Sequence, residues 1–144
     1  MTSTLKNSQK KNITFIDDSK ATSFVATKNA LQTNKNILWI VGGIPKLGDK
    51  ININKINRNI IKSYIIGKKT HYFQKQLKGK INYKISHNLD DSLKHIFVDI
   101  RKLKNTNITV LLSPSSASFD QFKNFVERGN KFKNLEKKYA KKYF

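Results

Sequence analysis

Three polar clusters follow apolar runs in this sequence, and their side chains suit the binding of anions. The clusters are DDSKATS at 17–23, GGIPKLGD at 42–49 and SPSSASFDQF at 113–122. Hydroxyl and ammonium groups bind phosphate and carboxylate oxygens, and so do the N–H groups at the start of a helix. Whether the three clusters act together depends on the elements that carry them.

Those elements alternate between strands and helices. Apolar runs predict strands at 13–17, 36–43, 62–67, 81–86 and 107–114, and helical periodicity predicts helices at 21–33, 53–59, 70–77, 88–104 and from about 120 onward. This order is typical of one α/β domain, a doubly wound, mostly parallel, Rossmann-like sheet flanked by helices. The polar residues 1–12 are predicted to be a tail or linker remnant, which leaves 13–144 as the domain.

The three polar clusters follow the first, second and last predicted strands, at the carboxyl end of each. Ligands of such sheets bind beyond the carboxyl ends of the strands. We therefore expect the three clusters to form one shared site.

Three helices have apolar residues that can share a face. The predicted stripes are Phe24, Val25, Ala30 and Leu31; Leu89, Leu93, Ile96, Phe97, Ile100 and Leu103; and Phe122, Phe125, Val126, Phe132, Leu135 and Tyr139. Asn88 is predicted to cap the second of these helices, with Asp90 and Asp91 in its first turn.

Composition restricts the class of protein. The chain has 144 residues, no cysteine and a net charge of +20, and 38% of its residues are hydrophobic. No run approaches the roughly 20 apolar residues of a membrane span, and no apolar leader is visible, so we expect a cytoplasmic globular domain without disulfides.

The charge suggests nucleic acid or another polyanion as a partner. However, all but three of the 29 basic residues are lysines, dispersed along a chain that is also rich in asparagine and isoleucine. Arginine is the better residue for bidentate phosphate and base contacts. We therefore favour a compositional bias and expect neither specific nucleic-acid binding nor a membrane partner.

Familiar catalytic motifs are absent. GKKT at 67–70 resembles the end of a P-loop, but Lys62 and Lys69 stand where that motif needs glycine and a hydroxyl. The three histidines lack metal-ligand spacing, and the serines form no nucleophile elbow. We assign no catalytic or metal-binding residue to this chain.

Taken together, the three clusters resemble the C-terminal domain of the Mur ligases, in particular the branch that adds D-glutamate. The resemblance lies in DDSKATS, GGIPKLGD and LLSPSSASFDQFKNFVERGNKF, and it covers roughly residues 13–135. It implies an ATP- and Mg²⁺-dependent enzyme of peptidoglycan synthesis that joins D-glutamate to UDP-N-acetylmuramoyl-L-alanine through an acyl phosphate. The family's UDP-sugar domain and P-loop domain have no counterpart here, so the isolated chain is predicted to be an inactive fragment.

The resemblance also implies roles for individual residues. Asp18 would bind the ATP ribose, and Lys20 would reach the phosphates. The residues implied for D-glutamate are Thr22, Lys46, Ser118, the backbone N–H of Phe119, and Phe125 as a wall of the pocket.

Structural interpretations compete with some of these roles. Thr22 could cap a helix, and Ser118 with Gln121 forms a capping box. Phe125 could belong to a core, and Lys46 could be a solvated lysine.

Where the family usually has asparagine, this chain has Asp17 and Ser23, and Asp17 adds a negative charge beside the nucleotide. A stand-alone basic module that binds anions or nucleic acid remains the alternative function.

Overall fold

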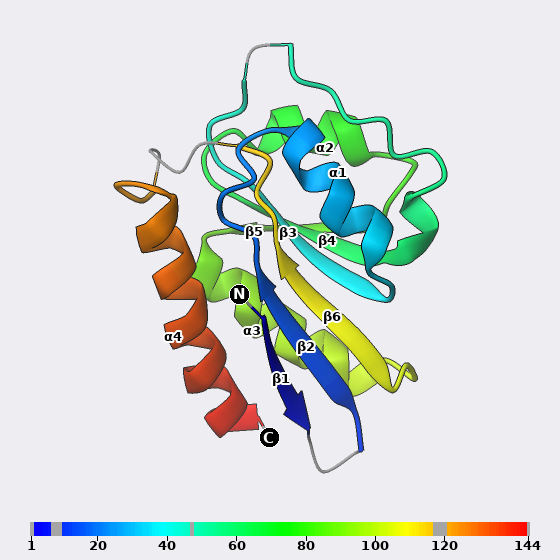
Figure 1. Ribbon diagram of the computed structural model, residues 1–144, viewed down its shortest axis with the longest axis vertical. Coiled ribbons are helices and arrows are strands. Elements are labelled where there is room, and N and C mark those ends of the chain that lie inside the picture. Colours follow the sequence, from blue (N-terminus) through cyan, green and yellow to red (C-terminus); the bar gives the residue numbers. More distant parts are fainter. Residues whose placement is uncertain (1, 7–9, 47, 117–120, 144) are drawn as a thin grey trace.

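The computed structural model describes residues 2–6, 10–46, 48–116 and 121–143, which form one six-stranded sheet with helices on both faces (Figure 1). The strands are β1 (Thr2–Lys6), β2 (Asn12–Asp17), β3 (Ile37–Gly42), β4 (Ile60–Ile66), β5 (Tyr83–His87) and β6 (Asn107–Leu112). The helices are α1 (Phe24–Thr33), the short 3₁₀ helix η1 (Asn57–Asn59), α2 (Thr70–Leu77), α3 (Leu89–Lys102) and α4 (Phe125–Tyr143).

The sheet has the strand order β1-β2-β6-β3-β4-β5, and β1 alone of these strands is antiparallel to its neighbour. Helices α1 and α2 bury Phe24, Leu31 and Phe73 in the core on one face. Helices α3 and α4 cover the other face, where Phe97 and Phe132 are buried. All residues of β3 are buried, as a strand between two helical layers requires. The predicted doubly wound α/β fold is confirmed.

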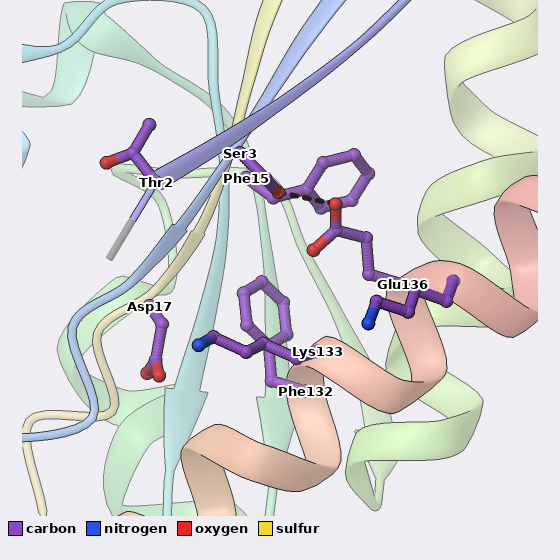
Figure 2. A pocket seen from close by; sticks show the side chains of 8 residues that line it. Thr2, Ser3, Phe15, Asp17, Phe132, Lys133 and Glu136 are labelled. Carbon is purple, nitrogen blue, oxygen red and sulfur yellow. Dashed lines mark hydrogen bonds between the residues drawn. The ribbon is translucent and has the colours of Figure 1, made fainter.

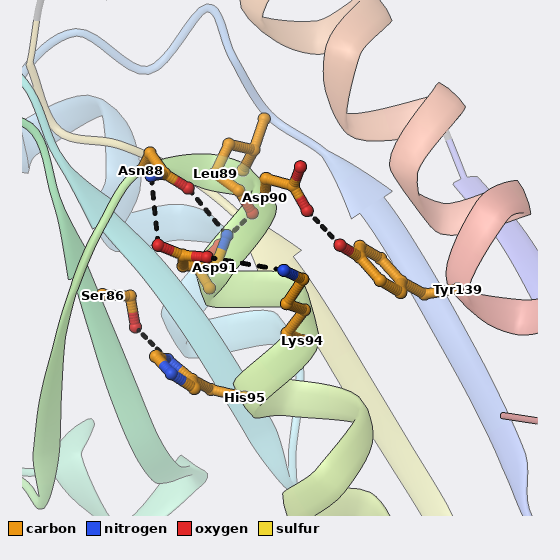
Figure 3. A network of polar contacts seen from close by, with 9 residues as sticks. Ser86, Asn88, Leu89, Asp90, Asp91, Lys94, His95 and Tyr139 are labelled. Carbon is orange, nitrogen blue, oxygen red and sulfur yellow. Dashed lines mark hydrogen bonds and ion pairs between the residues drawn. The ribbon is translucent and has the colours of Figure 1, made fainter. Parts of the chain in front are cut away.

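Helix α3 forms as its sequence indicates. Asn88 caps it by accepting a 2.7 Å hydrogen bond from the Asp91 N–H, and its apolar stripe is buried. In the first turn, Asp90 accepts a hydrogen bond from the Tyr139 hydroxyl of α4 (Figure 3). This contact links the last part of α4 to the first turn of α3.

The amino-terminal segment differs from its prediction. We expected a tail or linker remnant over 1–12, but residues 2–6 form β1, which pairs with β2 along its whole length. The segment is polar because an edge strand lies mostly in water, so its composition resembles that of a tail. The boundary of the domain at residue 13 stays a prediction.

Two helical predictions were too long. The predicted helix over 53–59 is only η1, because Ile51, Ile53 and Ile56 extend into the core as an irregular loop. The final helix begins at Phe125 rather than near residue 120. Its first-turn residues Phe125 and Val126 are 39% and 55% exposed, so they do not belong to the buried stripe.

Helix α1 buries Phe24 and Leu31 as predicted, and Ala30 packs against the same core, but Val25 does not belong to this face. Val25 is 81% exposed, whereas Thr27 is fully buried between Phe24 and Leu31. The hydroxyl of Thr27 is needed in the interior because it bonds to buried serines. Within the described residues, no helix combines the length and apolar character needed to cross a bilayer.

Candidate functional site

The carboxyl ends of β2, β6 and β3 lie side by side and bring polar clusters together. In the sheet, Asp17 pairs with Leu112, and beyond the strands the Gly42 N–H donates a 3.0 Å hydrogen bond to the Pro114 carbonyl. The chain leaves β6 toward α4 on one face, and it leaves β2 toward α1 on the other. Such a reversal is the point at which sheets of this class bind ligands.

Asp18 is held at this reversal by backbone and side-chain contacts. Its N–H donates to the Leu112 carbonyl at 2.8 Å, and its Oδ2 accepts a 2.7 Å hydrogen bond from the Ser113 hydroxyl. The hydroxyls of Ser113 and Ser115 also contact the buried Thr27 hydroxyl, at 2.9 and 2.6 Å. Burial raises the pKa of Asp18, the Ser113 hydrogen bond lowers it, and neighbouring Asp17 raises it. The net result is a pKa above the ordinary one.

A surface pocket of about 400 Å³ adjoins Asp18. Its lining consists of Asp17, Asp18, Ser19, Lys20, Phe125, Val126 and Asn130. The exposed ammonium of Lys20 and the partly exposed ring of Phe125 therefore share one pocket with the Asp18 carboxylate. Three of the residues predicted from the sequence are thus brought together, and the interpretation of Phe125 as a core residue is wrong.

The loop after β3 is tied to the start of α1. Asp49 accepts a 2.9 Å hydrogen bond from the Phe24 N–H through its Oδ2, and the Asp49 N–H donates to the Lys46 carbonyl at 3.0 Å. Lys46 is exposed on this turn. The sequence reasoning missed Asp49, because a carboxylate stabilises a helix N-terminus but Asp49 and Phe24 are 25 residues apart, so no local pattern pairs them.

The interpretation of Thr22 as a helix cap was wrong, because Ser23 caps α1 by accepting a 3.3 Å hydrogen bond from the Ala26 N–H. At the start of α4, Asn124 accepts a 2.9 Å hydrogen bond from the Glu127 N–H. Both Ser118 and Phe119 lie outside the described residues, and their predicted roles stay predictions.

Two neighbouring residues of α4 that sequence reasoning left without a role contact the site. Arg128 is 1% exposed and donates to the carbonyls of Ser116 and Ser19, at 3.0 and 2.9 Å. Beside it, Gly129 packs directly against the Asp17 carboxylate, because a Cβ there would lie 2.4 Å from Asp17 Oδ2. The Asp17 carboxylate also accepts hydrogen bonds from the Ser19 N–H and hydroxyl, at 3.1 and 2.6 Å.

Asp17 also lines a second pocket, of about 200 Å³, between β1, β2 and α4 (Figure 2). Figure 2 shows Phe15 and Phe132 within it and Ser3 hydrogen-bonded to Glu136 across it. Burial raises the pKa of Glu136, while the Ser3 hydrogen bond and nearby lysines lower it. The Asp17 side chain therefore lies between this pocket and the one that holds Lys20.

The pocket beside Asp18 combines a hydrogen-bond acceptor with a cation. Asp18 uses one carboxylate oxygen for Ser113, and the Lys20 side chain lines the same pocket. Among the residues described, no three His, Cys, Asp or Glu side chains gather closely enough to hold a metal ion.

Curated proteins of one kind match most of this chain, whereas no family model matches it. The chain is 40% identical over 121 residues to the UDP-N-acetylmuramoylalanine–D-glutamate ligase of Agrobacterium fabrum. It is 41% identical over 121 residues to the ligase of that name from Wolbachia sp. subsp. Brugia malayi, and 39% over 127 residues to that of Nitrobacter winogradskyi.

These alignments cover 84%, 84% and 88% of this chain but 26%, 24% and 27% of the relatives. The chain therefore spans about a quarter of the length of the curated relatives it matches, which is consistent with a single domain of a larger enzyme. The resemblance carried by the three polar clusters is confirmed: the chain belongs to the Mur ligase family and corresponds to the C-terminal domain of its D-glutamate-adding ligases.

Proposed function

We propose that this chain acts as the C-terminal domain of an ATP-dependent ligase that adds D-glutamate to UDP-N-acetylmuramoyl-L-alanine. The main support is the convergence of the loops after β2, β3 and β6 at one edge of the sheet, beside a pocket that holds Asp18 and Lys20. The identity of about 40% to ligases of that name supports the same proposal.

Asp18 and Lys20 bind the nucleotide in this proposal. Asp18 accepts a hydrogen bond from a ribose hydroxyl, and its orientation is maintained by Ser113. Lys20 neutralises phosphate charge at the mouth of the pocket. ATP supplies the phosphoryl group that activates the carboxylate of the nucleotide-linked substrate, and Mg²⁺ is held mainly by residues outside this chain.

The remaining residues bind D-glutamate. Lys46 and the Thr22 hydroxyl contact its carboxylates, the Ser118 hydroxyl and the Phe119 N–H complete the set of donors, and Phe125 forms a wall. Placing the amine beside the activated carboxylate makes the reaction effectively unimolecular, a gain of up to about 7–11 kcal/mol in favourable cases. Thr22 follows Asp18 and Lys20 on the same turn, and Phe125 lines the pocket of those two residues, so the two substrates bind next to each other in this proposal.

In this proposal other domains take part in turnover, because the chain spans about a quarter of the length of the relatives it matches. The test supplies the remaining three quarters of a related ligase in trans and measures ADP release on addition of D-glutamate. We expect release with the mixture and none with this chain alone. If the mixture also fails, although its two parts are folded and associated, the proposal is wrong.

Lys46→Ala tests the amino-acid site in the same assay, with Lys50→Ala as the matched control because both lysines are exposed on one loop. The first variant should lose D-glutamate dependence, since it removes the cation that pairs with a carboxylate, and the second should retain it. Equal activity of both variants would contradict the role of Lys46.

A further inference from the structure

The buried side chain of Arg128 connects two loops of the candidate site, the one after β2 and the one after β6. Its side chain starts on the first turns of α4 and is 1% exposed. One terminal nitrogen donates to the Ser19 carbonyl at 2.9 Å, and the other donates to the Ser116 carbonyl at 3.0 Å. Ser19 and Ser116 are 97 residues apart in the sequence, so the guanidinium joins segments that the backbone does not connect locally.

The proposed function assigns substrate contacts to residues of both connections: nucleotide contacts to the turn after β2, and D-glutamate contacts to the segment that follows Ser116. Ser19 lies between Asp18 and Lys20, and Ser116 is the last described residue before the segment that contains Ser118. A direct contact accompanies the Arg128 bridge, because the Ser115 N–H donates to the Ala21 carbonyl at 2.9 Å. The loops are therefore held in one fixed spacing by contacts on both sides.

Arginine is suited to this position by the shape of its donor group. A planar guanidinium presents donors in a rigid fork, so its two ends can serve two acceptors at a set separation. The lysine ammonium is a compact charge on a flexible stem and does not fix such a separation. Phe125 and Val126, at the start of the same helix, line the pocket that contains Lys20. Arg128 therefore also holds this wall of the pocket in place relative to both loops.

We propose that Arg128 is a positioning residue that sets the distance between the nucleotide turn at 18–22 and the loop at 113–116. The inference rests on the proposed function for the identity of the two substrates, but the coupling of the loops is a property of this chain alone. Without the Arg128 guanidinium, the two loops are no longer held at a fixed distance from each other. The affinity for D-glutamate then falls, because the groups that bind D-glutamate are no longer aligned with the bound nucleotide.

Hydrogen exchange of the isolated chain tests the coupling directly. In Arg128→Lys, we expect the amides of Ala21 and Ser115 to exchange about tenfold faster or more, while those of Val110 and Leu111 in β6 keep their rates. The matched control is Arg101→Lys, an exposed arginine that donates to one carbonyl, that of Tyr143. Unchanged exchange at Ala21 and Ser115, or equal acceleration in β6, would overturn the proposal.

Kinetics separate positioning from simple destabilisation. In the mixture with the remaining ligase domains, Arg128→Lys should raise KM for D-glutamate about tenfold or more, since small displacements of binding groups have large effects. Loss of folded protein alone would lower kcat at constant KM, and that result would contradict a positioning role. If the unmodified mixture releases no ADP, the proposed function fails, and the exchange experiment decides the role of Arg128.

Discussion

At the scale of single residues, the contact between Gly129 and Asp17 shows how closely α4 approaches the site. Glycine inside a helix normally costs about 0.5–1 kcal/mol relative to alanine. Here a Cβ would lie 2.4 Å from Asp17 Oδ2, and the hydrogen bonds from Ser19 limit the movement of that carboxylate. The lack of a side chain at position 129 is therefore what allows α4 to begin against the nucleotide turn.

Gly129→Ala should destabilise the fold by about 1–3 kcal/mol, although the same change at an ordinary helical position is stabilising. The measurement is the free energy of unfolding in urea. Repeating it in an Asp17→Ala background should remove the penalty, because the clashing carboxylate is absent. A penalty that persists in that background would show that another contact is responsible.

Asp18 has a raised pKa, which makes its contribution to stability dependent on pH. Since the folded state binds the proton more tightly than the unfolded state, ionised Asp18 destabilises the protein above the ordinary value of 3.8, and the penalty disappears as the pH falls below it. The Asp18→Asn variant keeps an acceptor for Ser113 without the charge.

Asp18→Asn should therefore be slightly more stable than the parent chain at pH 7, by about 1 kcal/mol or less because solvent screens this half-buried group. The difference should shrink as the pH is lowered toward 3.8. Thermal unfolding at a series of pH values measures it. A gap that widens on acidification would mean that the carboxylate is stabilised in the fold.

At the scale of elements, the end of β3 determines how closely two strands and the site loops approach. Gly42 has φ +134°, and a Cβ there would lie 2.0 Å from the Ile66 carbonyl oxygen of β4. Its N–H meanwhile donates to the Pro114 carbonyl in the loop after β6. The first glycine of GGIPKLGD is thus required by strand packing as well as by the site.

Gly42→Ala should cost about 2–4 kcal/mol, because backbone strain and a steric clash add together. Gly48→Ala is the matched control: Gly48 also has positive φ, but no atom lies within 4 Å of its added Cβ. The control should show only the smaller cost of the left-handed conformation, about 1–2 kcal/mol. Equal losses in urea unfolding would exclude the clash with Ile66 as the cause.

At the scale of the whole molecule, β1 completes the sheet beside the helical layer formed by α3 and α4. It pairs with β2, and its Ser3 hydroxyl contacts Glu136 on α4 (Figure 2). Its residues are mostly exposed, so it adds little to the core. Its main physical effect is to cover the hydrogen-bonding edge of β2, which carries Phe15 and ends at the site.

Deletion of residues 2–6 should therefore leave the core folded but promote association, since β2 becomes an open edge. Circular dichroism should keep its helical signal, while light scattering should rise with protein concentration. As a control, replacing the same residues with other β-forming polar residues should preserve a monodisperse chain. A variant that unfolds outright would show that β1 belongs to the cooperative core.

The sequence by itself determined the class of fold and the family, and it predicted the edge of the sheet where the polar clusters meet. Hydrophobic periodicity predicted β2 to β6 and α3, because buried faces must match the period of each element. It did not predict β1, the exposure of Val25, the burial of Thr27 or the start of α4, because these depend on neighbours distant in the sequence. Residues 117–120, which include Ser118 and Phe119, lie outside what the structure describes.

Only the tertiary structure decided how the site is held together. The Thr27 hydroxyl contacts Ser113 and Ser115, and Arg128 joins the carbonyls of Ser19 and Ser116. Except for Arg128 and Ser116, the two partners of each contact are separated by 86 to 109 residues in the sequence. Local sequence patterns carry no information about such pairs, because the contacts arise only when β6 inserts between β2 and β3 and α4 folds back across the site.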